Sequence, residues 1–380
     1  MLKIVADDKI PFLRGILEPF AEVKYLPGGK ISRADLLDAD ALLTRTRTRC
    51  GAELLEGTAV KFIASATIGF DHIDTHYCQS RGIRWTNAPG CNSESVAQYM
   101  TSLLLTRAHR TGKPLKGKTI GIIGVGNVGS KVARNARALG MTVLLNDPPR
   151  ARQEGPEGFS ELEKIKQEAD FITFHVPLCK DGEDATYHAA DDAFFNTLGK
   201  KPFFINSSRG EVCCNAALKQ ALLSGKLAGA ALDVWENEPG IDRELLNLLD
   251  FATPHIAGYS ADGKSNGTAM SILSLISFFG LADRFDRSTL QKPPLPEGRE
   301  INLLPYDQEG EPETELLYRA VTASYDIAAD DLSLRGNPAG FEKLRGDYPL
   351  RREFDSYTVT APAFLLETLK TLRFEIRKGE

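Results

Sequence analysis

The stretch that decides the fold is an apolar run followed by a glycine-rich turn, Thr119-Ile-Gly-Ile-Ile-Gly124-Val-Gly126-Asn127-Val128-Gly129. The apolar run predicts a strand over residues 119–123, and the sequence after it predicts a helix over residues 127–139. A second apolar run, residues 141–145, precedes Asp147, which lies 18 residues past Gly129. A strand, a Gly-x-Gly-x-x-Gly turn, a helix, a strand and an acid in this order predict a dinucleotide-binding βαβ unit.

Each glycine of the turn has a predicted role. Gly124 permits the tight turn, Gly126 lets the backbone approach a pyrophosphate, and Gly129 lets helix and strand pack closely. The N-terminus of the helix would receive the phosphate charge. Asp147 would accept hydrogen bonds from the adenosine ribose and repel a 2′-phosphate, so NAD is expected rather than NADP. A purely structural glycine-rich turn is the alternative interpretation. The predicted phosphate-binding residues are Gly124, Gly126, Asn127, Val128 and Gly129.

Apolar runs alternate with amphipathic stretches on both sides of this unit, which favours parallel sheets covered by helices on both faces. Before the unit, strands are predicted over residues 2–5, 41–44, 61–65 and 83–85, and helices over 12–20, 33–38 and 74–81. After it, strands are predicted over residues 171–175, 202–206 and 229–234. The predicted fold class is α/β, with two doubly wound parallel-sheet domains of Rossmann-like or flavodoxin-like type.

The domain prediction follows from the breaks in this alternation. Residues 1–93 are predicted as one domain, completed by part of a helix over 262–285, and residues 94–262 as the NAD-binding domain. A proline-rich linker then leads into residues 286–380, a small α+β domain with strands near 301–304 and 357–360 and helices near 314–325 and 364–372. That segment holds 13 Lys/Arg and 18 Asp/Glu, so it carries all of the net charge of −5.

Composition excludes several classes of protein. Of the 380 residues, 42% are hydrophobic and 26% charged, as in an ordinary globular protein rather than a disordered or coiled-coil one. No apolar stretch reaches the length of a membrane span and no secretion signal is evident, so a cytoplasmic protein that binds neither membrane nor nucleic acid is expected. The six cysteines lack metal-ligand spacing, so reduced thiols and no metal are expected. In Asp71-His72-Ile-Asp74-Thr-His76 an acid is expected to cap a helix rather than to bind a cation.

Three polar side chains follow predicted strands of the second domain: Arg209, Glu238 and His255. Ligands of open α/β sheets lie beyond the carboxyl ends of the strands, so these residues could converge on one cleft. The guanidinium group suits a carboxylate, and an imidazole beside a carboxylate suits proton transfer. Taken singly, Arg209 could equally form a surface ion pair and His255 could cap a helix.

The order of these motifs resembles the D-2-hydroxyacid dehydrogenase family across residues 1–285. Further segments are similar to a branch of that family that oxidises a 4-phosphorylated four-carbon 2-hydroxy acid at C2 in vitamin B6 synthesis. They are Leu145-Asn-Asp-Pro-Pro-Arg150, Phe174-His-Val-Pro-Leu178, Leu232-Asp-Val-Trp-Glu-Asn-Glu-Pro239, Thr253-Pro-His-Ile-Ala-Gly-Tyr259 and the C-terminal Lys343-Leu-Arg345, Tyr348 and Arg351-Arg352-Glu353.

The resemblance implies roles for individual residues. Arg209 would hold the substrate carboxylate, His255 would remove the hydroxyl proton, and Glu238 would orient the imidazole. It also implies further cofactor contacts at Val176, Ser207, Ser208, Asp233 and Gly258. The implied substrate contacts are Thr46, Thr67 and Tyr259, and residues 1–93 would form the substrate-binding domain. Cations that could meet the phosphate are Arg45 and Arg47, with Lys264, Arg351 and Arg352 as further candidates.

Two positions depart from the family pattern. Val212-Cys213-Cys214-Asn215 stands where relatives show Val-Val-Asp-Asn, and Asn215 is expected to replace the missing acid as a helix cap. Thr46 stands where a serine is common and keeps the hydroxyl.

The C-terminal segment suggests a homodimer. One of its predicted helices carries an apolar face that is expected to lie at a two-fold interface, formed by Leu316, Leu317, Ala320, Val321 and Tyr325. Arg351 and Arg352 could then reach the neighbouring subunit. The alternatives are an effector-binding regulatory domain, a dehydrogenase for another acid such as 3-phosphoglycerate, and a non-enzymatic NAD-sensing protein.

Overall fold

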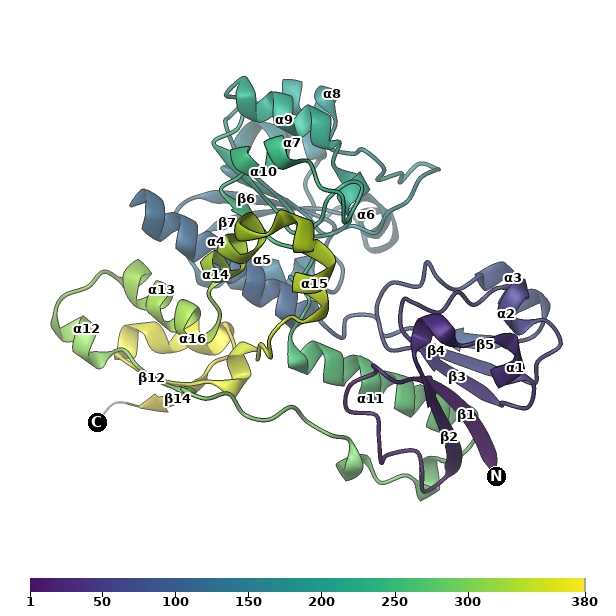
Figure 1. Cartoon of the computed structure of the whole chain (residues 1–380). Helices are drawn as coiled ribbons and strands as arrows, with labels where there is room; N and C mark the ends of the chain where they lie inside the picture. Colours follow the sequence, from purple (N-terminus) through teal and green to yellow (C-terminus); the bar gives the residue numbers. More distant parts are fainter. Residues whose placement is uncertain (379–380) are drawn as a thin grey trace. The chain divides into compact units, whose positions relative to one another are not determined.

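The computed structural model describes residues 1–378, which fold as two compact units (Figure 1). The first unit contains Met1–Asn92 and Ser260–Pro294, and the second contains Ser93–Tyr259 and the chain from Leu295 onward. The C-terminal segment therefore packs with the central part of the chain. The predicted division into three domains stays a prediction. Among the described residues, no helix combines the length and the apolar character that crossing a membrane requires.

The first unit is built on a five-stranded parallel sheet in the order β2-β1-β3-β4-β5. The strands are β1 (Leu2–Asp7), β2 (Ala21–Leu26), β3 (Ala41–Thr44), β4 (Phe62–Ser65) and β5 (Arg84–Thr86). The helices are α1 (Arg33–Leu36), α2 (Ala52–Leu55), α3 (Thr75–Ser80) and α11 (Ala261–Phe278). Alternate strand residues enter two cores, because successive side chains point to opposite faces of a sheet.

Residues 12–20 do not form the predicted helix. Leu13, Ile16 and Leu17 have helical spacing and are buried, but they lie in a series of turns. Phe12 adopts a φ of +59° and Gly15 a φ of +86°, which no right-handed helix accommodates. The predicted cap at Asp74 is confirmed, since its carboxylate accepts the N–H of Tyr77 at the start of α3.

The second unit contains a six-stranded parallel sheet in the order β11-β10-β9-β8-β6-β7. Its strands are β6 (Thr119–Ile123), β7 (Thr142–Asn146), β8 (Phe171–Phe174), β9 (Phe203–Asn206), β10 (Gly229–Leu232) and β11 (Phe251–Ala252). Its helices are α4 (Ser93–Thr111), α5 (Gly129–Ala138), α6 (Pro148–Glu154), α7 (Leu162–Glu168), α8 (Asp192–Asn196), α9 (Asn215–Leu223) and α10 (Arg243–Leu248). The predicted α/β class with two parallel sheets is confirmed.

The C-terminal segment adds a third, smaller parallel sheet and further helices to the second unit. The sheet has the order β12-β13-β14, with β12 (Glu300–Asn302), β13 (Thr358–Ala361) and β14 (Glu375–Lys378). The helices are α12 (Leu304–Gln308), α13 (Glu313–Ser324), α14 (Ile327–Gly336), α15 (Phe341–Gly346) and α16 (Leu366–Thr371). The sequence predicted β12, β13, α13 and α16 but not α12, α14, α15 or β14.

The apolar face of α13 is covered within the chain, so the argument that it is left over for a second subunit is wrong. The face packs against α4, and both helices contribute to one hydrophobic core with β6, β9 and β11. The Ser102 hydroxyl of α4 also donates to the carbonyl of Tyr325, directly after α13. Helix α4 is buried on most of its circumference, which makes it a central helix rather than a surface one.

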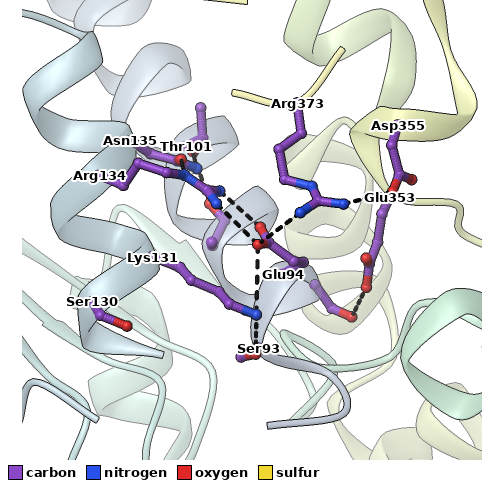
Figure 2. Close-up of polar contacts among 12 residues, drawn as sticks. Ser93, Glu94, Thr101, Ser130, Lys131, Arg134, Asn135, Glu353, Asp355 and Arg373 are labelled. Atoms are coloured by element: carbon purple, nitrogen blue, oxygen red, sulfur yellow. Dashed lines mark hydrogen bonds and ion pairs between the residues drawn. The ribbon is translucent and has the colours of Figure 1, made fainter. Parts of the chain in front are cut away.

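Charged side chains connect the C-terminal segment to the rest of the second unit at two further places. Figure 2 shows Glu94 of α4 receiving both Arg134 of α5, at 2.8 and 3.0 Å, and Arg373, at 3.7 Å. At the far edge of the sheet, the buried Asp331 of α14 accepts the N–H of Ala252 in β11, at 2.7 Å. This bond occupies a backbone group that an edge strand would otherwise leave open.

Candidate active site

Every strand of the six-stranded sheet is followed by at least one residue predicted to bind or react. All six strands are parallel, so their carboxyl ends lie along one edge of the sheet. The residues are Gly124–Gly129 after β6, Asp147 after β7, Val176 after β8, Ser207, Ser208 and Arg209 after β9, Asp233 after β10, and His255 after β11. Thus the topology brings the predicted cofactor residues and the predicted catalytic residues of this unit to one edge.

The glycine-rich loop has the geometry that its spacing predicts. Gly124 adopts a φ of +88°, and a Cβ there would lie 2.6 Å from the carbonyl oxygen of His175. A Cβ on Gly129 would lie 2.0 Å from the Gly124 carbonyl oxygen, so only glycine allows α5 to begin this close to β6. A Cβ on Gly126 would meet no atom within 4 Å, which leaves its backbone accessible to a ligand before the N-terminus of α5.

Asp147 is held beside this loop. Its Oδ2 accepts the N–H of Val125 at 2.8 Å, and its Oδ1 accepts the N–H of Arg150 at 3.1 Å as the cap of α6. An ionised carboxylate has about four acceptor sites, so acceptor positions remain for ribose hydroxyls. A cavity of about 270 Å³ opens here, lined by Asn146, Asp147, Pro148, Ala151, Arg152, Pro156, Phe159, Ser160 and Glu161.

Two buried polar atoms at the same sheet edge have no protein partner among the described residues. They are the Oγ of Ser207, after β9, and the Nδ1 of His175, after β8. Buried polar atoms are nearly always hydrogen-bonded in native proteins, so these two atoms are suited to form hydrogen bonds with a polar ligand. Together with the open backbone at Gly126 and the acid at Asp147, they suit a dinucleotide.

Glu238 and His255 form a hydrogen-bonded pair. Nδ1 of His255 lies 2.8 Å from Oε2 of Glu238, while Oε1 of Glu238 accepts the N–H of Trp235 at 2.9 Å. The side chains are 18% and 29% exposed, so both are partly withdrawn from water. Because the carboxylate occupies Nδ1, the imidazole presents Nε2 as its reactive nitrogen.

Burial and pairing act in opposite directions on Glu238. Burial alone would raise the pKa of this carboxyl group, but the hydrogen bond and charge of His255 hold the pKa below its ordinary value, with help from the Trp235 N–H and Arg345. Glu238 is therefore a stable anion at neutral pH. An anion in this position holds the imidazole ring in one orientation through the hydrogen bond at Nδ1.

Asp233 holds the loop that carries His255. Its buried carboxylate accepts hydrogen bonds from the Thr253 hydroxyl at 2.6 Å and from the N–H groups of Ile256 and Ala257 at 2.8 and 2.9 Å. His255 itself adopts a φ of +57°, a conformation that costs a non-glycine residue energy unless its surroundings impose it. The predicted cofactor contact of Asp233 stays a prediction, and these bonds show that the residue also shapes the loop.

Arg209 lies on the turn after β9, next to the loop that carries Glu238. A Cβ on Gly210 would lie 2.0 Å from the carbonyl oxygen of Trp235, so the two loops are in direct contact. The side-chain amide of Asn206 donates to the Arg209 carbonyl at 2.9 Å and fixes the turn. Nη1 of Arg209 donates to the Ser208 carbonyl, and the side chain remains partly exposed.

The predicted substrate contacts Thr46, Thr67 and Arg45 belong to the first unit. Thr46 follows β3 and Thr67 follows the neighbouring strand β4, so both lie at the carboxyl edge of that sheet. Thr46 is exposed, whereas the Thr67 hydroxyl donates to the Gly69 carbonyl. The Arg45 guanidinium pairs with buried Asp7, with Nε 3.1 Å from Oδ2. In the second unit, Tyr259 and Gly258 follow His255 on the same loop.

Two arginines of the C-terminal segment contact this loop, which sequence reasoning did not predict. Nη2 of Arg351 donates to the Ala257 carbonyl, and Nε of Arg345 donates to the Tyr259 hydroxyl at 2.8 Å. Arg351 and Arg352 are both buried in their own chain, so the expectation that they reach a neighbouring subunit is wrong. No local pattern signals contacts between residues about 90 positions apart.

The expected cap at Asn215 is also wrong. The Asn215 side-chain oxygen is buried and has no hydrogen-bond partner in residues 1–378, and Glu236 accepts the Asn215 N–H at 2.7 Å instead. Glu236 also bonds Nε2 of His188, and with Cys214 these form the one cluster within the described residues that has metal-ligand chemistry. The Glu236 carboxylate already has a protein partner on each oxygen, so capping and pairing account for the cluster. The expected absence of a metal stays a prediction.

Comparisons with known proteins agree with this geometry. Residues 92–257 match the NAD-binding domain of D-isomer specific 2-hydroxyacid dehydrogenases, and residues 297–372 match a domain of unknown function. The structure of NAD⁺-bound 3-phosphoglycerate dehydrogenase from Entamoeba histolytica is similar with a TM-score of 0.63 and 25% identity, covering 74% of this chain and 96% of that one.

The fold and the site therefore define an NAD-binding D-isomer specific 2-hydroxyacid dehydrogenase. Erythronate-4-phosphate dehydrogenase of Bacteroides thetaiotaomicron is 52% identical over 94% of this chain and 99% of its own length. The Porphyromonas gingivalis enzyme of the same name is 42% identical over 98% of both chains. The chain belongs to the erythronate-4-phosphate dehydrogenase family.

Proposed function

We propose that this protein oxidises 4-phospho-D-erythronate to (R)-3-hydroxy-2-oxo-4-phosphooxybutanoate with NAD, a step in the synthesis of pyridoxal 5′-phosphate. The observation that carries the proposal is the Glu238–His255 pair, 2.8 Å apart, at the same sheet edge as Arg209 and the glycine-rich loop. The name and near-complete coverage of the Bacteroides thetaiotaomicron relative support the particular substrate.

The side chains of the second unit suit each requirement of the reaction. The Arg209 guanidinium can bind two oxygens of the C1 carboxylate and so fix the orientation of C2. Nε2 of His255 takes the proton of the C2 hydroxyl, and the Glu238 anion stabilises the resulting imidazolium. Bound NAD would supply the acceptor for the hydride that leaves C2. Asp147 and the glycine-rich loop would hold its adenosine and pyrophosphate.

A substrate panel tests the proposal against its alternatives. NADH formation is followed with 4-phospho-D-erythronate, D-3-phosphoglycerate and the unphosphorylated D-erythronate. The highest kcat/KM is expected with 4-phospho-D-erythronate. A higher value with 3-phosphoglycerate would assign the protein to another acid. Tight NAD binding without turnover of any of these acids would favour the non-enzymatic NAD-sensing alternative.

We propose that the protein acts in the cytoplasm as a homodimer joined through its C-terminal segment. The apolar face of α13 no longer supports this, but four large apolar side chains in the described part of the segment are exposed: Leu295, Leu332, Leu350 and Phe364. Scattered apolar side chains are common on surfaces, so mutation is required. Leu332→Glu and Phe364→Glu are expected to reduce the mass measured by light scattering from that of two chains to one. An unchanged dimer mass in both variants would show that the interface is formed by other residues.

A further inference from the structure

A cation with unused hydrogen-bonding capacity contacts the loop that carries His255. Arg345 of α15 donates from Nε to the hydroxyl of Tyr259, at 2.8 Å, and its Cζ lies 5.6 Å from the centre of the tyrosine ring. Tyr259 is four residues past His255 on the same loop. Through α15, whose Phe341 is fully buried in the core, the C-terminal segment brings this charge to the reactive edge of the sheet.

The terminal nitrogens of Arg345 have no close partner among the described residues. Nη1 lies 3.9 Å from Oε1 of Glu342, beyond hydrogen-bond distance, and the arginine side chain is 25% exposed. A guanidinium offers five N–H donors in a planar fork that matches two oxygens of a carboxylate or phosphate. The Tyr259 bond uses one donor, so the fork remains available to an anion that approaches from solvent.

The charge of Arg345 contributes to the electrostatic environment of Glu238. It is among the groups that keep the pKa of Glu238 below its ordinary value, behind the burial of that carboxyl group and its bonds to His255 and Trp235. Because Arg345 bonds Tyr259, four residues past His255, an anion bound at its fork would lie at the loop that carries His255. A four-carbon substrate has its phosphate and its C2 hydroxyl only a few bonds apart, so this closeness is what such a substrate requires.

Arg351 contacts the same loop but cannot serve in this way. It is 5% exposed, and its guanidinium lies over the rings of Tyr325, at 4.4 Å, and Tyr348, at 5.8 Å. Its Nη2 is used by the Ala257 carbonyl. Arg351 therefore supports the loop from inside the protein, whereas Arg345 faces outward beside the loop.

We propose that Arg345 binds the phosphate group of the substrate, with Tyr259 holding the guanidinium in the binding orientation. This inference rests on the proposed function, which supplies a phosphorylated substrate. It makes Arg345 a specificity residue that the C-terminal segment contributes to the active site of its own chain.

Arg345→Met tests the inference by comparing two substrates that differ only in the phosphate. With 4-phospho-D-erythronate, KM is expected to rise about 10- to 100-fold, the usual worth of a charge-assisted pair of hydrogen bonds. With D-erythronate, kcat/KM is expected to change less than about twofold. Equal losses with both substrates would overturn the proposal, because they would mean that Arg345 only positions the loop. An unchanged KM for the phosphorylated acid would overturn it as well.

Three variants serve as controls. Lys343→Met removes a highly exposed cation from the same helix, one that pairs with Asp347, and is expected to leave both substrates unaffected. Tyr259→Phe removes the orienting hydroxyl but keeps the cation, so the preference for the phosphorylated acid should shrink without disappearing. Arg345→Lys keeps the charge but loses the fork, and should recover part of the preference. Unchanged thermal unfolding and NAD binding establish that each variant is folded.

A binding measurement separates this inference from the proposed function. If the wild type does not oxidise 4-phospho-D-erythronate, the proposed function fails. Arg345 is then tested with inorganic phosphate, titrated by calorimetry into the NAD-loaded protein. The wild type is expected to bind phosphate at least tenfold more tightly than Arg345→Met. Equal affinities would overturn the phosphate assignment of Arg345.

Discussion

His255 owes its position to its neighbours rather than to its own conformational preference. Its φ of +57° is held by the carboxylate of Asp233, which accepts hydrogen bonds from residues before and after His255 in the loop. The hydrogen bond from Glu238 orients its ring. The Thr253 hydroxyl that donates to Asp233 also contacts the hydroxyl of Tyr99 on α4, at 2.9 Å. The reactive nitrogen is thus fixed by a chain of hydrogen bonds that reaches the central helix.

We expect His255→Asn to lower kcat by about 10²- to 10⁴-fold, the usual contribution of a positioned acid–base group. The affinity for NAD is expected to stay within about twofold, because all predicted cofactor residues except Gly258 lie on other loops. Steady-state rates and fluorescence titration with NADH give both quantities. A kcat near that of the wild type would remove His255 from the proposed mechanism.

Asp147→Ala tests the choice between the two nicotinamide cofactors. Without the carboxylate, NAD loses its ribose contact and NADP loses a repelling charge, so the ratio of kcat/KM for NAD to that for NADP should fall by at least tenfold. The same substitution removes the cap of α6, so a loss of about 1 kcal/mol in stability is expected as well. A wild-type protein that prefers NADP would contradict the assignment of Asp147 to the ribose.

Because His175 is buried, we expect the stability of the folded protein to decrease at acidic pH. Burial lowers the pKa of its imidazole to about 3, while the unfolded value is about 6.5, so between these values the unfolded chain binds the extra proton. The contribution of His175 to stability is therefore complete above pH 6.5 and decreases as the pH falls, by up to about 1.4 kcal/mol per pH unit.

Urea unfolding of the cofactor-free protein at pH 7 and pH 5.5 measures this effect. His175→Gln cannot take up the proton, so its loss of stability between the two pH values should be about 1 kcal/mol smaller than that of the wild type. Equal losses in the two proteins would show that His175 is not held neutral by the fold.

At the scale of single elements, periodicity predicted the buried strands and missed what depends on distant partners. Strands β3, β6 and β9 are continuous apolar runs, and each lies within a residue of its predicted range. β2 is an edge strand with a mixed polar face, so its alternation is weak. Residues 12–20 have helical spacing, but turns with positive φ override it.

The candidate site shows the same limit. Arg209, Glu238 and His255 could be predicted because each stands in a local motif after a strand. Three other roles could not be predicted, because each residue acts on a partner that is far away in the sequence or on another loop. Asp233 supports the His255 loop, Arg345 contacts that loop, and Glu236 caps α9.

The packing of α13 on α4 gives a prediction for a single side chain. Leu317 is 3% exposed and faces the shared core, whereas Leu223 on α9 is 62% exposed. Leu317→Ala is expected to lower the free energy of unfolding by about 2–5 kcal/mol, through lost burial and the cavity left behind. Leu223→Ala is expected to change it by less than about 0.5 kcal/mol. Chemical denaturation of both variants measures these values, and a Leu317→Ala loss as small as that of Leu223→Ala would contradict the shared core.

For the whole molecule, the C-terminal segment and the six-stranded sheet share one core. Removing the chain after Pro294 would expose the face of α4 that α13 covers and would free the edge of β11 from Asp331. We therefore expect such a truncated protein to aggregate or to lose cooperative unfolding, whatever its oligomeric state. Light scattering and a thermal melt check this, and a monodisperse, cooperatively folded truncation would contradict it.

The bond from Arg351 to the carbonyl of Ala257 has a consequence for how members of this family can recombine. A crossover near residue 294 would join a catalytic loop from one parent to the arginines from another. In such a hybrid, the residues after His255 and the arginines that contact them come from different parents and have not evolved together. Shuffled genes from distant parents should then yield folded proteins with poor turnover. Crossovers that keep residues 255–259 together with residues 341–351 should retain activity.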